Sequence, residues 1–332
     1  MKEPDKILHT VRTVCSRQRL AITVVSGRFA RFFPAGSGGE GPRIIDAGDL
    51  TITVQGLADT RNLAQADVVV LQCHQHRDEP AFLKSLRDTG YEGLIVGWFW
   101  DNHHGRDRNR AVADLVDVAI ASHEVHAAYL AEHARLLPSV MLCSTQWTRS
   151  DASALWASLP LSSNRAEGLY GGFGRYPSAT RTAWLAGLIA SGRYPGLWFA
   201  NDEGAPPYFK LTAEQRFYHW ARYAVSLCVP YRDDLSNRFF DAWLTGQIPV
   251  VTPDIAELSA PWAQAHRDRD FVCAASYTEE DIDAAYRRAR ELFDSGGVAG
   301  QQARHQLALD HHLLEHRIAQ IVTQLREVAA VG

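Results

Sequence analysis

The chain has 332 residues, of which 46% are hydrophobic and 10% aromatic, a content that excludes an intrinsically disordered protein. It carries 34 basic and 38 acidic residues, for a formal net charge of −4. This balance argues against the class of proteins that bind nucleic acid through bulk positive charge. No stretch approaches about 18 uninterrupted apolar residues, so we expect no membrane span. The charged start of the chain, residues 1–6, does not have the pattern of a secretory signal.

The cysteines are scattered singly, and none forms a C-x-x-C pair. An odd and dispersed set predicts neither a disulfide framework nor a structural zinc site. Most of these thiols lie in apolar runs, where cysteine acts as a small buried hydrophobic residue. We therefore expect a soluble, cytoplasmic protein. The five residues are Cys15, Cys73, Cys143, Cys228 and Cys273.

In the first half of the chain, apolar runs alternate with mixed segments. The run at 67–72 is continuous and rich in β-branched residues, as in a strand that is buried on both faces. Strand, helix and strand at this spacing predict a parallel sheet covered by helices. The expected strands are 21–25, 50–54, 67–72, 94–100 and 117–121, and the expected helices are 80–88 and 108–115.

The second half repeats this alternation. We expect a helix from Thr278 that closes at Gly296 and Gly297, followed by a final helix with Leu307, Leu314 and Ile318 on one apolar stripe. The other expected elements are strands at 168–174, 197–200, 224–229, 248–251 and 271–274, with helices at 179–191, 213–223 and 237–245.

The length favours two domains, and the polar stretch at 148–166 marks their boundary. We expect an α/β protein with two Rossmann-like parallel-sheet domains, 1–160 and 161–300, that face a cleft. A C-terminal helix, 301–332, follows. In parallel sheets of this kind, ligands sit at the carboxyl ends of the strands. That rule selects the residues to inspect.

The most informative segment runs from 229 to 251, where a strand ends, a polar loop follows and a helix starts near Asn237. The first N–H groups of a helix lack backbone partners and carry partial positive charge, which favours a phosphate. Arg232 and Arg238 flank this start, and arginine offers a planar fork of donors for phosphate oxygens. Asp241 lies one turn further on and could accept hydrogen bonds from sugar hydroxyls. The alternative is a surface turn with solvated charges.

The pattern Asn-Arg-Phe-Phe-Asp-Ala-x-x-x-Gly-x-Ile-Pro-Val-Val at 237–251 resembles the donor-site signature of GT-B glycosyltransferases. The exostosin-like, fucosyltransferase-like and group 1 donor domains are the most similar. The resemblance implies that Arg238 contacts a nucleotide diphosphate and Asp241 contacts donor hydroxyls. It also implies an N-terminal acceptor domain, a C-terminal donor domain and a last helix that packs back toward the first domain. Asp233 lies eight positions before Asp241, where retaining members carry a second acid, usually glutamate, and this leaves the stereochemistry open.

Glycines follow another expected strand, at 171–174, and Arg175 comes directly after them. Glycine lets a backbone approach a phosphate closely. By resemblance this is the loop that begins the donor domain, with Gly172, Gly174 and Arg175 near the donor. The alternative is a plain turn. Arg181, in the helix that follows, is expected to be solvated.

Histidines are frequent after the expected strands of the first half. Asp101, His103 and His104 follow one strand and are our candidates for removing the acceptor proton. His74 and His76 follow another strand, and their role stays open. A metal site built from these histidines is an alternative. We expect no metal, because no H-x-x-x-H motif or facial-triad spacing appears and GT-B enzymes usually need none.

Histidines near the end of the chain are expected on the solvated face of the last helix. These are His305, His311, His312 and His316.

The resemblance predicts a glycosyltransferase of carbohydrate biosynthesis that moves a hexosyl or deoxyhexosyl group from a nucleotide diphosphate sugar to a hydroxyl or amine. Its partners would be that donor and a glycan or small-molecule acceptor, without a cofactor and without nucleic acid. Two alternatives stay open, a non-catalytic nucleotide-sugar-binding partner subunit and a metal-dependent enzyme that uses the first-domain histidines. The sequence identifies neither the donor nucleotide nor the acceptor.

Overall fold

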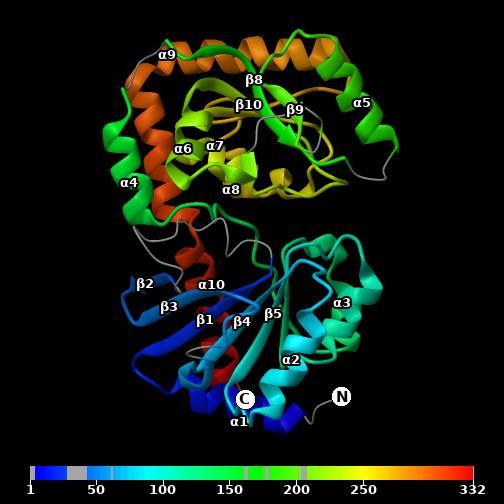
Figure 1. The fold of residues 1–332 in the computed structure, drawn as a ribbon, viewed down its shortest axis with the longest axis vertical. Coiled ribbons are helices and arrows are strands. Elements are labelled where there is room, and N and C mark those ends of the chain that lie inside the picture. The colour runs from blue at the N-terminus through cyan, green and yellow to red at the C-terminus, as the bar shows by residue number, and fades with distance from the viewer. Residues whose placement is uncertain are drawn as a thin grey trace. The chain divides into compact units, whose positions relative to one another are not determined.

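The computed structural model describes residues 4–27, 43–60, 63–160, 164–175, 179–200, 202 and 208–331. The chain divides into two compact units. The first comprises Met1–Gln146 and Leu314–Gly332, and the second comprises Trp147–Leu313. Each unit contains a sheet with helices packed around it (Figure 1).

The sheet of the first unit has the strand order β2-β3-β1-β4-β5-β6-β7 in the described residues, and only β2 runs antiparallel to its neighbour. Every residue of β4 and β5 is buried, as their continuous apolar sequence predicts for strands covered on both faces. The strands are β1 (Leu20–Ser26), β2 (Arg43–Ala47), β3 (Leu50–Gly56), β4 (Val68–Cys73), β5 (Leu94–Phe99), β6 (Val118–Ala121) and β7 (Arg135–Leu137).

The helices of this unit come from both ends of the chain. Helix α10 (Leu314–Val331) contacts α1 (Pro4–Cys15), and the apolar stripe of α10, with Ile318 and Ile321, is buried. The prediction that the last helix packs back on the first domain is thus confirmed. The remaining helices are α2 (Glu79–Asp88) and α3 (Arg106–Ala113), with short 3₁₀ turns η2 (Leu63–Gln65), η3 (Glu124–His126) and η4 (Ala128–Glu132).

The sheet of the second unit is parallel throughout its described residues, in the order β12-β11-β10-β8-β9. Its strands are β8 (Ala166–Phe173), β9 (Leu197–Phe199), β10 (Tyr223–Cys228), β11 (Ile248–Val251) and β12 (Val272–Cys273). Its helices are α4 (Arg149–Ser158), α5 (Ala179–Ala190), α6 (Ala213–Ala221), α7 (Arg238–Leu244), α8 (Pro261–Gln264) and α9 (Glu279–His311), with 3₁₀ turns η5 (Tyr208–Lys210) and η6 (Ala256–Ser259).

The boundary between the units differs from the expected one. Helix α4 belongs to the second unit, because Trp156 stacks on His305 of α9 at 4.1 Å between ring centroids. The single final helix expected from residue 301 is also wrong. Helix α9 continues past a kink at Gly297 to His311, and α10 starts separately at Leu314 in the other unit.

Two of the four histidines expected on a solvated helix face are buried. His305 is 3% exposed and His312 is 8% exposed, whereas His311 is exposed and His316 half-buried. The ring of His305 stacks on Trp156 and hydrogen-bonds the carbonyl of Leu244, and the ring of His312 stacks on Phe240. These partners lie far away in the sequence, so helical periodicity alone could not show them.

The parallel registers bring the carboxyl ends of β1, β4, β5 and β6 to one edge of the first sheet. They likewise bring the ends of β8, β10 and β11 to one edge of the second. The predicted pair of Rossmann-like parallel sheets is confirmed, apart from the antiparallel β2. No helix in the described residues is both long and apolar enough to cross a membrane.

Candidate functional site

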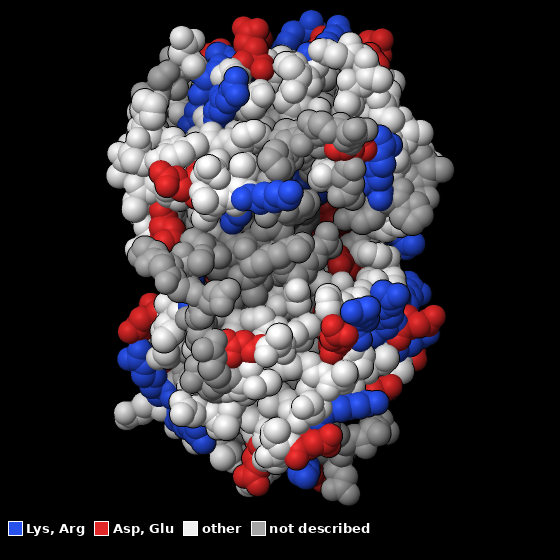
Figure 2. Space-filling view, in the orientation of Figure 1, with Lys and Arg blue, Asp and Glu red and all other residues white. Residues whose placement is uncertain are grey.

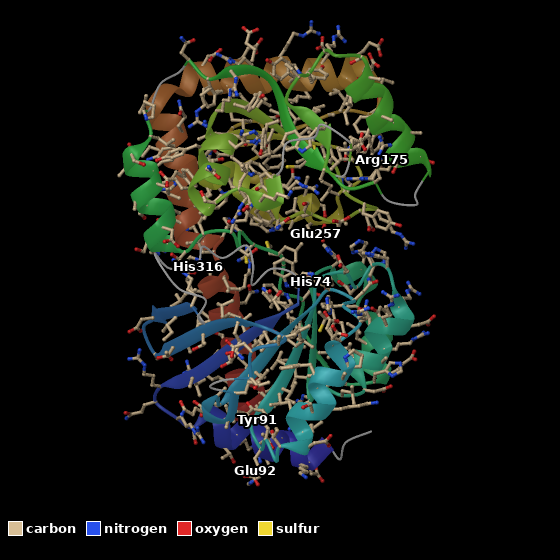
Figure 3. All side chains as sticks on the ribbon, in the orientation of Figure 1. His74, Tyr91, Glu92, Arg175, Glu257 and His316 are labelled. Carbon is tan, nitrogen blue, oxygen red and sulfur yellow. The ribbon has the colours of Figure 1, made fainter. Side chains whose placement is uncertain are left out.

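Two groups of side chains gather at the carboxyl edges of the two sheets, and each is described within its own unit. The histidine edge of the first unit consists of His74, Asp101, His103, His104 and His123. Figure 3 places His74 at one end of the first unit's strands and Tyr91 and Glu92 at the other end. The arginine edge of the second unit consists of Arg175, Arg181, Arg232 and Arg238, with Arg175 just beyond the end of β8 (Figure 3).

On the histidine edge, the loops after β4 and β5 bring an imidazole to a carboxylate. Nδ1 of His74 lies 4.0 Å from Oδ2 of Asp101. The His74 side chain is 3% exposed and packs edge-on against Trp100, with 4.8 Å between ring centroids, whereas Asp101 is 27% exposed. The pair therefore has one buried member and one member that solvent reaches.

His103 is the centre of a cluster of imidazole rings. Its ring centroid lies 4.4 Å from that of His104, 4.9 Å from that of His123 and 6.2 Å from that of His126. His103 and His123 are each 2% exposed, and His104 is half-buried. The structure thus brings Asp101, His103 and His104 together with His74, as the strand-end rule predicts.

His76 does not join this cluster. Its ring is 40% exposed and lies 3.6 Å from the carboxylate of Asp78. The same ring approaches Gly27 at the end of β1, where an added Cβ would come within 3.0 Å of it. Sequence spacing placed His74 and His76 together, but the intervening Gln75 has a φ of 59°, which turns the two side chains apart.

Amide side chains hold the loops of the histidine edge in place. Nε2 of Gln75 donates to the carbonyl oxygens of Asp101 (3.2 Å) and His104 (3.0 Å), and Nδ2 of Asn109 donates to the same two carbonyls at the same distances. Asn102 exchanges two hydrogen bonds with the backbone of His123. Because these bonds fix the backbone, the side chains between them are pre-positioned.

Glu79, at the start of α2, is a residue that the sequence analysis missed. Its side chain is fully buried, and Oε1 accepts a hydrogen bond from the N–H of His74 at 2.8 Å. Burial raises the pKa of Glu79 to about 7, although the N–H groups of the 74–76 loop favour its charged form. The signal for it would have been an acid at a helix start directly after a strand-end histidine.

On the arginine edge, two guanidinium groups share one aromatic ring. The Cζ atoms of Arg181 and Arg238 lie 5.6 Å and 5.4 Å from the ring centroid of Phe173, the last residue of β8. A guanidinium over an aromatic face keeps its charge while it is partly desolvated. The end of β8 therefore has two permanent positive charges near one aromatic ring.

The expectation that Arg181 is solvated is wrong. Arg181 is 9% exposed, and its guanidinium donates to the carbonyls of Pro230 (2.7 Å), Gly174 (3.3 Å) and Val229 (3.4 Å). It thereby ties the end of β8 to the chain that follows β10. The sequence could not show this, because the carbonyls lie on segments about 50 residues apart.

The glycines near the end of β8 have a structural reason of their own. A Cβ on Gly172 would lie 2.7 Å from the ring of Trp198, so this position must be small. Arg175 follows Gly174 and forms two hydrogen bonds of 2.7 Å each with the carboxylate of Asp202, while its guanidinium lies 4.0 Å from the ring centroid of Phe199. Arg175 is exposed, and this carboxylate offsets its charge.

The start of α7 differs from the expectation of unpaired N–H groups. Asn237 makes no side-chain cap. The N–H groups of Arg238, Phe239 and Phe240 are all bonded within the segment itself, to Ser236 or Asn237. In the preceding loop, the carboxylate of Asp234 accepts from the N–H groups of Tyr231 and the exposed Arg232. An anion here would therefore be held by guanidinium groups rather than by the helix backbone.

Asp241 faces the interior of the second unit. It is 1% exposed, and Arg216, itself 3% exposed, is a charged neighbour. Burial lowers the pKa of the Arg216 guanidinium, and the Asp241 carboxylate opposes that shift. Asp233, eight residues earlier, is half-buried in the loop and accepts through its carbonyl from the N–H of Ala256. The two acids with the expected spacing thus lie in different surroundings.

The charged surface mixes both signs. On the face drawn in Figure 2, lysine and arginine side chains stand beside aspartate and glutamate side chains. Exposed pairs such as Arg290 with Asp294 (2.9 Å) and Arg326 with Asp49 (2.6 Å) show the same mixing.

No family model and no curated protein matches the chain. Solved structures do. A sucrose-phosphate synthase from Thermosynechococcus elongatus has a TM-score of 0.50 at 11% identity, over 95% of this chain and 100% of the other. The N-terminal domain of a trehalose-6-phosphate phosphatase from Candida albicans has a TM-score of 0.52 at 7% identity, over 93% and 97%. At such identities the likeness establishes the fold, and the predicted GT-B architecture is confirmed.

Proposed function

We propose that the chain is a glycosyltransferase that moves a sugar from a nucleotide diphosphate donor to a hydroxyl or amine acceptor. One observation carries this proposal. In a GT-B fold, the second parallel sheet ends in two guanidinium groups, Arg181 and Arg238, that share the ring of Phe173. The carboxyl edge of such a sheet is where ligands bind, and paired guanidinium groups match the charge and shape of a diphosphate.

The donor chemistry follows from these charges. When the bond between sugar and diphosphate breaks, negative charge develops on the departing phosphate oxygen. Fixed cations at that place stabilise the transition state without reorganising. Arg238 is the first candidate because it is half-buried and less firmly tied than Arg181, which donates to three carbonyls. Gly172, Gly174, Arg175, Arg232 and Asn237 complete the proposed donor site.

Asp241 has a narrower part in this proposal. The resemblance of segment 237–251 assigns it to the donor hydroxyls. Since its carboxylate is 1% exposed, it reaches such a hydroxyl only after a local rearrangement of the residues around α7. In the structure its charge acts on the buried Arg216 guanidinium instead.

The acceptor chemistry belongs to the histidine edge. Transfer to a hydroxyl or amine requires that the acceptor lose its proton as the new bond forms, and an imidazole or carboxylate does this near neutral pH. Asp101, His103 and His104 are the proposed catalytic residues. Asp101 is more exposed to solvent than its neighbour His74, which favours Asp101 for contact with an acceptor.

The experiment is a thermal-shift screen of the full chain with UDP, GDP and ADP, using the matching nucleosides as controls. A ligand that binds only the native state stabilises it and thereby raises the melting temperature. At a ligand concentration one hundred times the dissociation constant, the free energy of unfolding increases by about 2.7 kcal/mol. We expect a shift with at least one diphosphate, none with its nucleoside, and a smaller shift in Arg238→Ala.

Donor hydrolysis and transfer are then measured with sugars on the nucleotide that binds. If no nucleoside diphosphate shifts the melting temperature, the donor assignment is wrong. Tight binding without hydrolysis or transfer to any acceptor would identify the chain as a nucleotide-sugar-binding subunit instead.

A further inference from the structure

We propose that Asp101, His103 and His104 bind a divalent metal ion of the zinc type. Each residue offers one ligand atom, and these atoms all lie within 4.8 Å of one another. Elsewhere in the described part of the chain, no three histidine, cysteine or acidic side chains converge in this way. The proposal concerns metal binding and does not depend on the transfer reaction.

The donor set fits such an ion chemically. Two imidazole nitrogens and one carboxylate oxygen are the ligands of many catalytic zinc sites, which keep a fourth position open. The same set serves Fe²⁺ in facial-triad sites. Around a tetrahedral zinc ion with bonds of about 2.1 Å, ligand atoms lie about 3.4 Å apart. Atoms that lie up to 4.8 Å apart must therefore move closer together when an ion binds.

The backbone that carries the ligands is already fixed. The N–H of His104 donates to the carbonyl of Asp101 at 3.2 Å, which closes a turn around the three residues. Gln75 and Asn109 each hold both ends of that turn. These bonds hold the backbone from which the three ligand side chains project.

Gly105 makes this clamp sterically feasible. Its φ is 59°, and an added Cβ would come within 2.0 Å of the Gln75 amide. A larger residue would therefore push Gln75 off the turn. The glycine directly after the two histidines thus belongs to the same arrangement.

The crowding of imidazole rings supports metal binding independently. His103 has the rings of His104, His123 and His126 within 6.2 Å, and only one proton acceptor is needed for transfer. Imidazole is a common metal ligand, so several rings gathered at one place match a metal site in the chemistry of their side chains.

The sequence analysis expected no metal because it found neither an H-x-x-x-H motif nor facial-triad spacing, and it kept a metal site as an alternative. In this chain the ligands occupy positions i, i+2 and i+3 of a loop after β5. Their convergence depends on the turn from Asp101 to His104 and on the Gln75 and Asn109 clamp, which comes from two other segments.

The test measures zinc bound to the full chain. The protein is stripped with a chelator, exposed to Zn²⁺, separated from free metal and analysed by elemental mass spectrometry. We expect about one zinc ion per chain. Replacement of zinc by Co²⁺ should give the visible absorption of a nitrogen- and oxygen-ligated tetrahedral site.

Three variants locate the ion. Asp101→Asn and His104→Gln should each lower the affinity for Zn²⁺ at least about tenfold, as loss of a ligand or its support does. His133→Ala is the matched control, because His133 pairs with Asp114 outside the cluster and its loss should leave zinc binding unchanged. Circular dichroism of each variant verifies that it is folded.

Two results would overturn the proposal. One is a wild-type chain that retains no zinc after loading. The other is undiminished affinity in folded Asp101→Asn and His104→Gln, which would locate the bound ion elsewhere. Transfer assays on the stripped protein are read separately, so sugar transfer without bound zinc refutes a catalytic ion and leaves the proposed function intact.

Discussion

The carboxyl edges of the two sheets occupy equivalent positions in their own sheets, but they carry different kinds of side chain. The first edge is built from imidazoles and a carboxylate, side chains that can bind protons or metal ions. The second is built from guanidinium groups, which stay charged at every physiological pH. The means of support differ as well, since neutral amides hold the loops of the histidine edge and carbonyl oxygens hold Arg181.

This difference fits the two tasks that we propose for the two edges. Proton transfer and metal binding need groups that gain and lose protons, and they benefit from loops fixed by uncharged partners. Holding a polyanion needs charge that does not titrate. The four predictions that follow test whether the two edges divide the work in this way, and they begin with the largest effect.

Loss of the acid–base groups should reduce the chemical step and spare donor binding. We expect Asp101→Ala or His103→Ala to lower kcat about 100–10,000-fold, the range for a lost general acid or base, with little change in donor affinity. Steady-state kinetics and donor titration measure the two effects separately. An unchanged kcat in both folded variants would move the catalytic group elsewhere.

Loss of Arg238 should have the complementary effect on the donor side. We expect Arg238→Ala to lower donor turnover at least about 100-fold, as with other groups that stabilise developing charge. Arg193→Ala is the control, because Arg193 is 50% exposed and pairs with Asp283 away from the arginine edge. Wild-type turnover in Arg238→Ala would refute the donor assignment.

Glu79 should make the first unit sensitive to pH. Its folded pKa of about 7 lies above the ordinary value of 4.5, so between these pH values the folded chain holds a proton that the unfolded chain has lost. Stability should fall as pH rises from 4.5 to 7 and then level off, by at most about 3 kcal/mol. Glu79→Gln should remove this dependence.

Urea unfolding of both proteins at pH 5 and pH 8 measures it. Glu92→Gln, at the opposite end of the strands, serves as the control (Figure 3). If wild type and Glu79→Gln lose the same stability between the two pH values, the buried carboxylate does not titrate in this range.

Removal of the Arg181 guanidinium should lower the stability of the protein. Arg181→Met keeps the apolar stem and leaves the carbonyls of Gly174, Val229 and Pro230 without this donor. We expect a loss of about 2 kcal/mol in the free energy of unfolding, typical for hydrogen bonds from a charged group. Denaturant titration measures it. A stability equal to that of wild type would mean that water replaces the guanidinium.

The strands and most helices could be predicted from the sequence because local patterns determine them. Continuous apolar runs predicted β4 and β5. The strand-end rule then predicted that Asp101, His103 and His104 lie close together, as they do in the structure. The GT-B fold was expected from the resemblance of a single segment, 237–251, which forms helix α7 and strand β11 in the structure.

What could not be predicted depends on partners that are distant in the sequence. Arg181 was expected in solvent, because two of its three carbonyl partners, Val229 and Pro230, lie about 50 residues further along the chain. His305 was expected on a solvated face. It is buried because Trp156, about 150 residues earlier in the chain, covers it. Glu79 acts through a backbone N–H of the preceding loop, and no residue pattern marks such a bond.

The return of α10 to the first unit has a consequence for biosynthesis. A ribosome makes residues 314–331 after the whole of the second unit, so the first unit lacks one of its packing helices until translation has passed that unit. During elongation the surface of α1 that α10 later covers is open to chaperones. The first unit therefore completes its packing only after α10 has been synthesised, whereas the second unit can fold before that point.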